Sequence, residues 1–277
     1  MEKIVLITGA ASGMGKATAI YLAQQGYRVY AGLRRANGEA LLHEASELNV
    51  SVNTVPLDVQ DTASVKHAVA EVLRREGRID VLVNNAGYGL LATVEDGTDD
   101  EMIRQFDVNV FGVLRMTREV LPIMRAQHGG VIINISSFLG RMGLPLLAHY
   151  NASKYAVEGI TDSLRFEVAP FNIRVHAIQS GLFGTNFVRS GLAANAATTA
   201  PDSPYAALVS HFAPMVAKAI NEGPSPMPIA EAVRMIIEDE NAPIAVPVGA
   251  EAETFMPLRK SLSDAAFERK VKETFGL

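Results

Sequence analysis

The chain has 277 residues, a net charge of −5 and no cysteine, which excludes disulfides, thiol nucleophiles and thiolate metal sites. Its Lys and Arg residues form no cluster longer than pairs such as Arg34-Arg35, so we expect no nucleic-acid partner. No segment approaches the roughly 20 apolar residues of a membrane span, and the histidines lack ligand spacing, so we expect neither a membrane partner nor a metal.

Strand-like and helix-like segments alternate along the chain. We expect strands at 3–8, 27–33, 51–56, 79–84, 130–136, 172–179 and 243–248, and helices at 14–25, 38–48, 61–76, 99–126, 150–168 and 229–239. Continuous apolar runs such as Ile4-Val5-Leu6-Ile7 are typical of parallel strands covered by helices on both faces. The pattern predicts an α/β fold, a single-domain (residues 1–277) Rossmann-like doubly wound arrangement with a mainly parallel seven-stranded sheet. The first strand starts almost at Met1, which leaves no room for a signal peptide and predicts a cytoplasmic protein.

Residues 186–228 interrupt this alternation. Ala, Ser, Pro and Gly accumulate there without a clear strand signal, between the last two expected strands. A connection this long within a compact domain is more often functional than idle. We therefore predict a lid insertion of one or two short helices, with Phe187, Leu192, Tyr205, Phe212 and Met215 facing the substrate from above. Simple packing of these side chains onto the body is the alternative.

The turn after the first strand reads Thr8-Gly9-Ala10-Ala11-Ser12-Gly13-Met14-Gly15. Here a strand ends and a helix opens, so free backbone N–H groups and a positive helix dipole meet at a point that suits a pyrophosphate. We expect one glycine for the tight turn, one for close approach of backbone to phosphate and one for helix packing. A purely structural turn is the alternative. The predicted dinucleotide contacts are Gly9, Ser12, Gly13, Met14 and Gly15.

The end of the second strand selects the cofactor. An acid at this point binds the ribose hydroxyl of NAD and repels the extra phosphate of NADP. This chain has Leu33 there, followed by Arg34 and Arg35. A guanidinium makes a charge-assisted contact with a phosphate, so we expect NADP(H) to be favoured over NAD(H), with Arg34 as the contact. Ordinary solvated loop charges are the alternative interpretation.

A tyrosine and a lysine form the candidate chemical site. Tyr150 and Lys154 lie one turn apart on the same face of an expected helix, so a phenol and an ammonium can meet at one substrate oxygen. That geometry suits proton transfer beside a nicotinamide, because a carbonyl oxygen gains negative charge as hydride arrives at carbon. Lys154 and the oxidised nicotinamide are expected to favour the phenolate. The neighbouring His149 points about 100° away, so we do not expect it to take part.

These features together resemble the short-chain dehydrogenase/reductase family, in its single-domain Tyr-x-x-x-Lys form, over roughly residues 3–190. The landmarks follow the family order: Thr8-Gly9-x-x-x-Gly13-x-Gly15, Asp58-Val59, Asn84-Asn85-Ala86-Gly87, Asn109, Ser137 and Tyr150-x-x-x-Lys154. One departure is Ser180-Gly181 after the sixth strand, where the family usually has Pro-Gly.

The resemblance implies a role for each matching position. The catalytic residues it implies are Asn109, Ser137, Tyr150 and Lys154, with the family spacing selecting Ser137 over Ser136. Lys154 is also implied to hold the ribose hydroxyls, and Asn109 a water for proton return. The further cofactor contacts it implies are Asp58, Val59, Asn85, Ala86, Gly87, Gly181, Phe183 and Thr185.

The activity implied is the interconversion of an apolar secondary alcohol and its ketone or aldehyde with NADP(H), with Tyr150 as general acid and base. Apolar residues that flank the expected site suggest the substrate pocket: Leu91, Phe138, Leu144, Leu147 and Phe187. Relatives usually pair through helices, so a homodimer or homotetramer is expected. An NAD-dependent alcohol or hydroxysteroid-type dehydrogenase and a non-catalytic nucleotide-sensing scaffold protein are the alternatives.

Overall fold

The computed structural model describes residues 2–34, 38–185, 187 and 191–277. Arg35 and part of the predicted lid, residues 186 and 188–190, lie outside the described residues. Among the described helices, none combines the length and apolar character needed to cross a bilayer.

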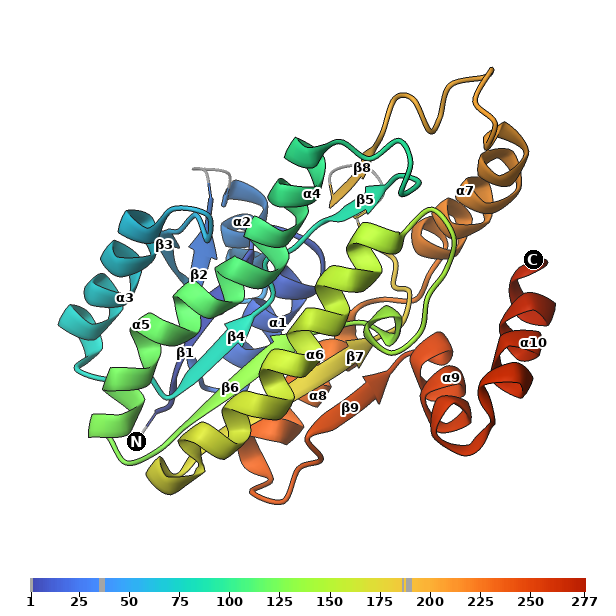
Figure 1. The fold of residues 1–277 in the computed structure, drawn as a ribbon. Coiled ribbons are helices and arrows are strands. Elements are labelled where there is room, and N and C mark those ends of the chain that lie inside the picture. The colour runs from blue at the N-terminus through green and yellow to red at the C-terminus, as the bar shows by residue number, and fades with distance from the viewer. Residues whose placement is uncertain (1, 35–37, 186, 188–190) are drawn as a thin grey trace.

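Seven parallel strands form one sheet with the order β3-β2-β1-β4-β6-β7-β9, as predicted (Figure 1). The strands are β1 (Ile4–Thr8), β2 (Arg28–Leu33), β3 (Asn53–Pro56), β4 (Val81–Asn84), β6 (Gly130–Ile135), β7 (Ile173–Ser180) and β9 (Ala245–Val248). From β1 the chain runs outward through β2 and β3, then returns to β4 on the other side of β1. Ligands of such sheets bind at this reversal, beyond the carboxyl ends of the strands.

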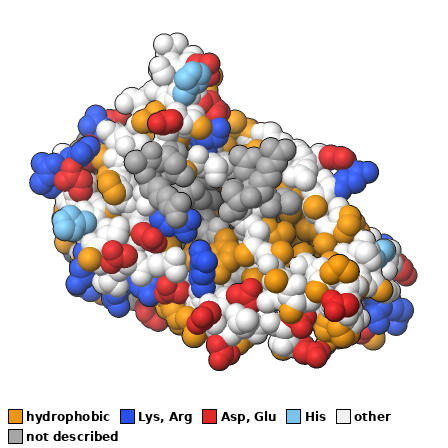
Figure 2. Space-filling view, turned by 90° about the horizontal axis from the view of Figure 1, so that it is seen from above, with side chains coloured by type: hydrophobic (Ala, Val, Ile, Leu, Met, Phe, Trp, Pro, Cys, Tyr) orange, Lys and Arg blue, Asp and Glu red, His pale blue; other side chains and the backbone are white. Residues whose placement is uncertain are grey.

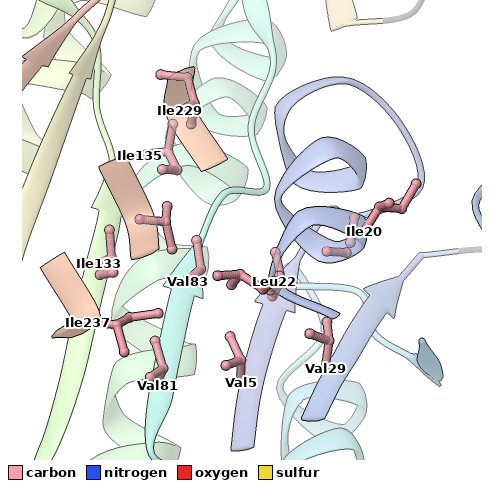
Figure 3. Close-up of a cluster of buried hydrophobic side chains, with 14 of the residues drawn as sticks. Val5, Ile20, Leu22, Val29, Val81, Val83, Ile133, Ile135, Ile229 and Ile237 are labelled. Carbon is pink, nitrogen blue, oxygen red and sulfur yellow. The ribbon is translucent and has the colours of Figure 1, made fainter. Parts of the chain in front are cut away.

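Helices cover both faces of the sheet (Figure 1). One face carries α1 (Gly13–Gln24), α2 (Glu39–Glu47) and α8 (Met227–Glu238), and the other carries α3 (Thr62–Glu76), α5 (Gly112–Ala126) and α6 (Ala148–Val168). Side chains alternate along a strand, so Val5 and Val83 pack beneath α1 and α8, while Leu6 and Leu82 pack beneath α3 and α5. Figure 3 shows the first of these clusters.

The helix expected at 99–126 has a different internal structure. It consists of α4 (Asp99–Phe106), a π-helical turn η1 (Asp107–Phe111) and α5. Its start is well capped, because Thr98 accepts from the backbone of Glu101 while the Glu101 side chain accepts from the backbone of Thr98. A π-turn inserts one residue into the helical repeat, and such insertions often mark functional positions.

The described part of the lid region contains the helix α7 (Ala206–Asn221), in keeping with the expected helical insertion. Other elements were not expected from the sequence, among them β8 (Leu192–Ala194), which pairs in parallel with β5 (Gly89–Leu91). The chain ends in α9 (Ala250–Ser261) and α10 (Asp264–Phe275), and short 3-10 turns lie at Phe138–Gly140 (η2) and Ala169–Phe171 (η3). A third apolar cluster, centred on Phe138, Phe212, Phe255 and Phe275, joins α7, α9 and α10 to the segment after β6.

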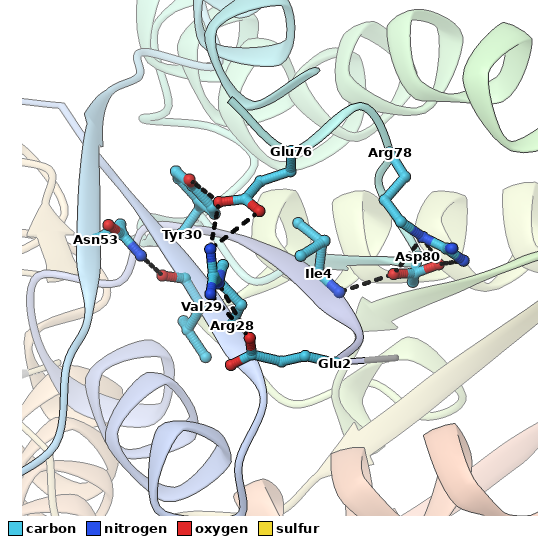
Figure 4. Close-up of polar contacts among 9 residues, drawn as sticks. All are labelled: Glu2, Ile4, Arg28, Val29, Tyr30, Asn53, Glu76, Arg78 and Asp80. Atoms are coloured by element: carbon cyan, nitrogen blue, oxygen red, sulfur yellow. Dashed lines mark hydrogen bonds and ion pairs between the residues drawn. The ribbon is translucent and has the colours of Figure 1, made fainter. Parts of the chain in front are cut away.

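Polar groups at the amino ends of the strands are paired with one another (Figure 4). The backbone N–H of Ile4 donates to Asp80 Oδ2 at 2.8 Å. Arg28 Nη1 lies 3.3 Å from Glu76 Oε2, and the Tyr30 hydroxyl donates to Glu76 Oε1 at 2.5 Å. The charges at this edge therefore have structural partners within the protein.

Two exposed glycines provide a matched test of this fold. Gly77 ends α3 with φ 71°, whereas Gly159 lies within α6, and a Cβ would meet nothing within 4 Å at either position. We predict that Gly77→Ala lowers the free energy of unfolding by about 1 kcal/mol, because only glycine adopts that backbone without strain. Gly159→Ala should raise it by about 0.5 to 1 kcal/mol. Urea unfolding measures both, and equal signs for the two variants would contradict the assigned backbone conformations.

Candidate active site

A cavity of about 610 Å³ opens at the carboxyl edge of the sheet. Its walls come from the turns after β1, β2, β3 and β4, from the start of α6 and from β8. Figure 2 looks down on this edge, where hydrophobic side chains gather on the face and charged ones border them. This cavity lies at the reversal of strand order, where the fold places ligands.

Thr8 fastens the glycine turn to the neighbouring loop. Its Oγ1 accepts from the backbone N–H groups of Asn85 at 3.0 Å and Ala86 at 2.9 Å. The side-chain Nδ2 of Asn85 donates in return to the carbonyl oxygens of Thr8 at 2.9 Å and Gly9 at 3.0 Å. The turn after β1 and the loop after β4 are therefore held as one unit before any ligand binds.

The glycines of the turn leave no room for side chains. A Cβ on Gly9 would lie 2.8 Å from Ala86 Cα, and one on Gly15 would lie 2.4 Å from Asn85 Nδ2. Gly9 and Gly13 also have φ of 65° and 57°, in the left-handed region that favours glycine. The close packing expected for Gly15 is thus present, against the loop after β4 and the turn itself.

The N-terminus of α1 is open to an anion. Ser12, its N-cap residue, makes no side-chain capping hydrogen bond, and the first turn contains no acidic residue. The backbone N–H groups and the positive end of the helix dipole therefore face the cavity without an internal partner of opposite charge. A pyrophosphate fits this arrangement, and no group of three or more His, Cys, Asp or Glu side chains among the described residues is placed to hold a metal.

Most of the predicted cofactor residues line this cavity. They are Gly9, Ser12, Gly13, Met14, Arg34, Asp58, Val59, Asn85, Ala86, Gly87, Tyr150, Lys154 and Thr185. Gly15, Gly181 and Phe183 are not among its described lining residues. A Cβ on Gly181 would meet Glu251 Oε2 at 2.6 Å, and Phe183 is buried with its ring against Gly249.

The last residue of β2, Leu33, is apolar and buried, so this strand end differs in both charge and burial from one that carries an acid. Leu33 is 6% exposed and belongs to the core cluster beneath α1 and α2, where its Cδ1 lies 2.6 Å from the position of a Cβ on Gly38. Arg34 is exposed and lines the cavity. The strand end therefore offers a guanidinium to the cavity, and its apolar residue serves the core.

Tyr150 lines the cavity, whereas Ser137 is not among its described lining residues. Ser137 Oγ donates to the Ser180 carbonyl at 3.5 Å and accepts from the Leu139 N–H at 3.2 Å. Burial raises the pKa of Tyr150 to about 12, and the nearby hydroxyl of Ser137 acts in the opposite direction. Without a cofactor the phenol therefore keeps its proton at neutral pH, which suits a donor. Lys154 Nζ lies 5.8 Å from the tyrosine ring centre and donates to another partner, so the lowering expected from Lys154 together with the oxidised nicotinamide stays a prediction.

Lys154 is buried, and its Nζ donates to the carbonyl oxygen of Ile135 at 2.8 Å. Burial lowers the pKa of Lys154 to about 8, and the carboxylate of Glu158 opposes this effect. Lys154 still lines the cavity. Its ammonium is therefore held beside the site by one backbone carbonyl, from which it can move to a ligand hydroxyl.

Asn109 lies in the π-turn η1 and is 2% exposed. Its Oδ1 accepts from the Tyr88 N–H at 3.0 Å, and its Nδ2 donates to the Tyr88 carbonyl at 2.9 Å and to Ser153 Oγ at 3.0 Å. Both amide donors are thus used within the protein. The side chain clamps the loop after β4 to α6, which adds a positioning role to the water-holding role that the resemblance implies.

Two neighbours of the predicted catalytic residues, His149 and Ser136, are buried side chains with different surroundings. His149 is buried, and its Nε2 lies 3.3 Å from the Thr93 carbonyl oxygen, so its ring is engaged by the segment after β5. Ser136 lies along the cavity, but its Oγ is buried and close to Gly140 and has no hydrogen-bond partner among the described residues. Ser137 lowers the pKa of Tyr150, whereas Ser136 lines the cavity, so the choice of Ser137 stays a prediction.

The predicted substrate residues separate into two groups. Phe187 lines the cavity, with its ring in edge contact with Tyr150 at 6.3 Å between centroids. The others are buried in the third apolar cluster: Leu91, Phe138, Leu144 and Leu147. They are covered because the lid helix α7 and the unexpected helices α9 and α10 pack against them. Phe212 of α7 belongs to the same cluster and Met215 packs against it, and neither is among the described lining residues of the cavity. Leu144, with Tyr205, also lines a second cavity of about 520 Å³ that contains neither Tyr150 nor the glycine turn.

Several cavity residues were not singled out from the sequence, among them Tyr88, Glu101, Arg104 and Ala193. Tyr88 directly follows Gly87, and that position is the only signal that could have found it. Arg104 reaches the cavity from α4 with its guanidinium 5.9 Å from the Tyr88 ring centre. Ala193 is brought there by pairing with Leu90, and a strand of three residues carries no recognisable pattern.

A family model described as short chain dehydrogenase matches residues 3–195. The chain belongs to the short-chain dehydrogenase/reductase family. A 3-ketodihydrosphingosine reductase from Bacteroides thetaiotaomicron is 37% identical over 259 residues, which cover 94% of this chain and 92% of that protein. As a family member, the protein is an oxidoreductase acting on CH–OH or C=O groups with a nicotinamide cofactor, and the prediction of family and activity class is confirmed.

Solved structures of the family agree with the fold. A short-chain dehydrogenase from Streptomyces avermitilis has a TM-score of 0.83 at 33% identity, covering 100% of this chain and 98% of that chain. An actinorhodin polyketide ketoreductase with NADPH has a TM-score of 0.77 at 29% identity, covering 91% and 98%. The predicted Rossmann-like α/β fold is confirmed.

The clamp made by Asn109 can be tested directly. We predict that Asn109→Ala lowers the free energy of unfolding by about 1 to 3 kcal/mol, because the N–H of Tyr88 loses its side-chain partner and its carbonyl keeps only Gln105. NADPH binding should weaken as well, since the released loop lines the cavity. Ser153→Ala is the matched control: it removes the third contact of the same amide and a hydrogen bond to the Tyr150 carbonyl but leaves both contacts to Tyr88, so it should weaken NADPH binding less. Wild-type stability and NADPH affinity in Asn109→Ala would contradict the clamp.

Proposed function

We propose that this short-chain dehydrogenase/reductase is an NADP(H)-dependent enzyme that interconverts an apolar secondary alcohol and its ketone. The observation that carries the proposal is that Tyr150 and Lys154 line the same cavity as the open N-terminus of α1. A proton donor, an ammonium and an anion site thus share one cavity. Such a combination suits reduction of a carbonyl next to a bound dinucleotide.

The cofactor would bind along the described lining. The N–H groups near Gly13 would hold the pyrophosphate, Asp58 and Val59 would border the adenine, and the loop at Asn85 would lie along its length. Thr185 lies beside this turn, with its Cβ 3.5 Å from the position of a Cβ on Gly13. When bound, the nicotinamide cofactor supplies or accepts the hydride at the substrate carbon.

The side chains of the protein would manage the proton and the charge on oxygen. Tyr150 would donate its proton to the forming alkoxide, which its high pKa in the ligand-free site permits. Ser137 would hydrogen-bond the same substrate oxygen and fix its orientation. Lys154 would leave the Ile135 carbonyl for the ribose hydroxyls and bring a positive charge towards Tyr150, which favours phenolate in the oxidation direction.

The substrate end of the cavity is mainly apolar. Leu90, Phe187, Leu192 and Ala193 line it, and charges are present at Glu101 and Arg104. The Glu101 carboxylate is already engaged by Thr98 and by Asn195 Nδ2 at 2.8 Å. The lining supports an apolar ketone, and the keto-compound reductases among the relatives support the same class. We also propose that the 186–228 insertion covers the substrate, since both Phe187 and β8 lie at the cavity.

A panel of aldehydes, ketones and secondary alcohols, followed by nicotinamide absorbance with each cofactor, tests the proposal. We expect turnover with apolar ketones and NADPH. An enzyme active only with NADH supports the NAD-dependent alternative, and activity confined to charged carbonyl compounds would contradict the assignment of the apolar wall.

Tyr150→Phe isolates the proton donor. The substitution keeps the ring against Phe187 and removes the hydroxyl, so turnover should fall at least about a hundredfold, within the range of general-acid contributions. NADPH affinity should change little, because the cofactor contacts remain. Steady-state kinetics measure turnover, and a fluorescence titration measures NADPH affinity. If the variant retains most of its turnover, another group donates the proton.

Arg34→Ala isolates the phosphate contact. Loss of a charge-assisted hydrogen bond should weaken NADPH by about 1.5 to 3 kcal/mol and leave NADH nearly unchanged. Arg104→Ala is the matched control, because Arg104 lines the same cavity without following β2. Comparing kcat/KM for both cofactors in the three proteins decides the matter. Equal losses for NADPH and NADH in Arg34→Ala would show that Arg34 does not contact the 2′-phosphate.

A further inference from the structure

Glu158 is a buried carboxylate one helical turn beyond Lys154. Both residues lie on α6, four positions apart, so their side chains share a face of the helix. Glu158 is 2% exposed. Acidic residues are rarely buried to this extent unless they are paired, so its partners need an explanation. None of the roles assigned to the site so far uses this carboxylate.

One oxygen of Glu158 has partners and the other does not. Oε2 accepts from Arg141 Nε at 3.0 Å and from Gln179 Nε2 at 3.0 Å. Oε1 is buried and has no hydrogen-bond partner among the described residues. Both partners of Oε2 donate, which suits the ionised carboxylate. Glu158 therefore forms an ion pair with Arg141 through one buried oxygen, while its other buried oxygen accepts from no described group.

The contacts of Glu158 join the segments that carry the catalytic residues. Arg141 follows the turn that begins at Ser137, and Gln179 precedes Ser180, whose carbonyl lies 3.5 Å from Ser137 Oγ. Gly140 packs among them, since a Cβ there would lie 3.0 Å from Glu158 Cγ and 3.1 Å from the Lys154 carbonyl oxygen. Glu158 thus lies directly behind the chemical site.

Burial disfavours the charged form of Lys154, and the carboxylate of Glu158 opposes this effect. A buried ammonium loses its hydration, and the single carbonyl of Ile135 replaces only part of it. A nearby opposite charge favours the charged form of such a group. Glu158 shares the helix face of Lys154, and no direct ion pair joins these two described residues. Arg141 pairs with the same carboxylate, but it also reaches Asp162 at 3.1 Å and its side chain is 40% exposed, so solvent screens it.

We propose that Glu158 is a positioning residue that keeps the Lys154 ammonium charged in the ligand-free enzyme, while the Ile135 carbonyl holds it in place for the cofactor. The inference rests on the proposed function of Lys154. The charged and titratable groups described around the pair are Arg141 after η2, Asp162 on α6 and Tyr150 at the cavity. Gln179 of β7 contributes a neutral donor.

The proposal predicts a shift in the titration of Lys154. The pKa of Lys154 is about 8, with burial lowering it and Glu158 raising it. The ammonium is therefore present below about pH 8 and lost as the pH rises through that value. Removing the carboxylate takes away the raising effect, so Glu158→Gln should move the midpoint down by about one pH unit or more.

The midpoint can be measured without substrate or cofactor. The protein labelled with ¹³C at lysine Cε is titrated by NMR, and the Lys154 signal is identified by its loss in Lys154→Met. Glu167→Gln is the matched control, because Glu167 lies on the same helix and is exposed, so its midpoint should equal that of the wild type. NADPH titrations at about pH 7.5 should then show roughly threefold weaker binding for Glu158→Gln, following the loss of charged lysine.

Arg141→Met is a second variant, for which the Lys154 midpoint should shift in the opposite direction. It removes the competing cation and leaves the carboxylate, so the Lys154 midpoint should rise. A purely structural role for Glu158 predicts instead that both variants lose stability and that neither moves the midpoint. If Glu158→Gln does not fold, Arg141→Met decides: an upward shift supports the proposal, and an unchanged or lower midpoint overturns it.

The NMR titration also separates this inference from the proposed function. A downward shift in Glu158→Gln supports the role of Glu158 even if the enzyme reduces no ketone in the panel. Normal ketone turnover with no shift overturns the role of Glu158 and leaves the proposed function standing.

Discussion

The locking of the β1–α1 turn onto the loop after β4 is the constraint on which the site depends. Thr8 Oγ1 accepts two backbone N–H groups of that loop, and Asn85 returns two hydrogen bonds to the turn. The backbones approach so closely that Gly9 and Gly15 have no room for a Cβ. Because the strand order reverses here, this single lock fixes both the anion site at α1 and the start of the cavity wall.

Burial then determines the chemistry of the two catalytic groups. It raises the pKa of Tyr150 and lowers that of Lys154, so the ligand-free site holds a neutral phenol and a cation that gives up its proton more readily than usual. The two shifts have the same cause, loss of hydration, and favour the uncharged form in each case. A nearby negative charge raises the pKa of Lys154 and so opposes the effect of burial, and we propose Glu158 as that group.

The sequence was sufficient for features that depend on local pattern. Seven apolar runs predicted the seven parallel strands, and the spacing of Tyr150 and Lys154 predicted their shared helix face. It was insufficient where contacts join distant segments without a pattern. β5 and β8 are three residues each, so their pairing left no signal, and the burial of Phe138 depends on Phe255 of α9, with ring centres 6.5 Å apart.

A crystal structure of the protein with NADP⁺ tests the central claim most directly. The account predicts phosphates at the N–H groups of the turn near Gly13, the 2′-phosphate beside Arg34, and Lys154 Nζ moved from the Ile135 carbonyl to the ribose hydroxyls. A dinucleotide bound elsewhere would contradict the account. So would a dinucleotide bound in this cavity with Lys154 still held by the Ile135 carbonyl and the 2′-phosphate away from Arg34.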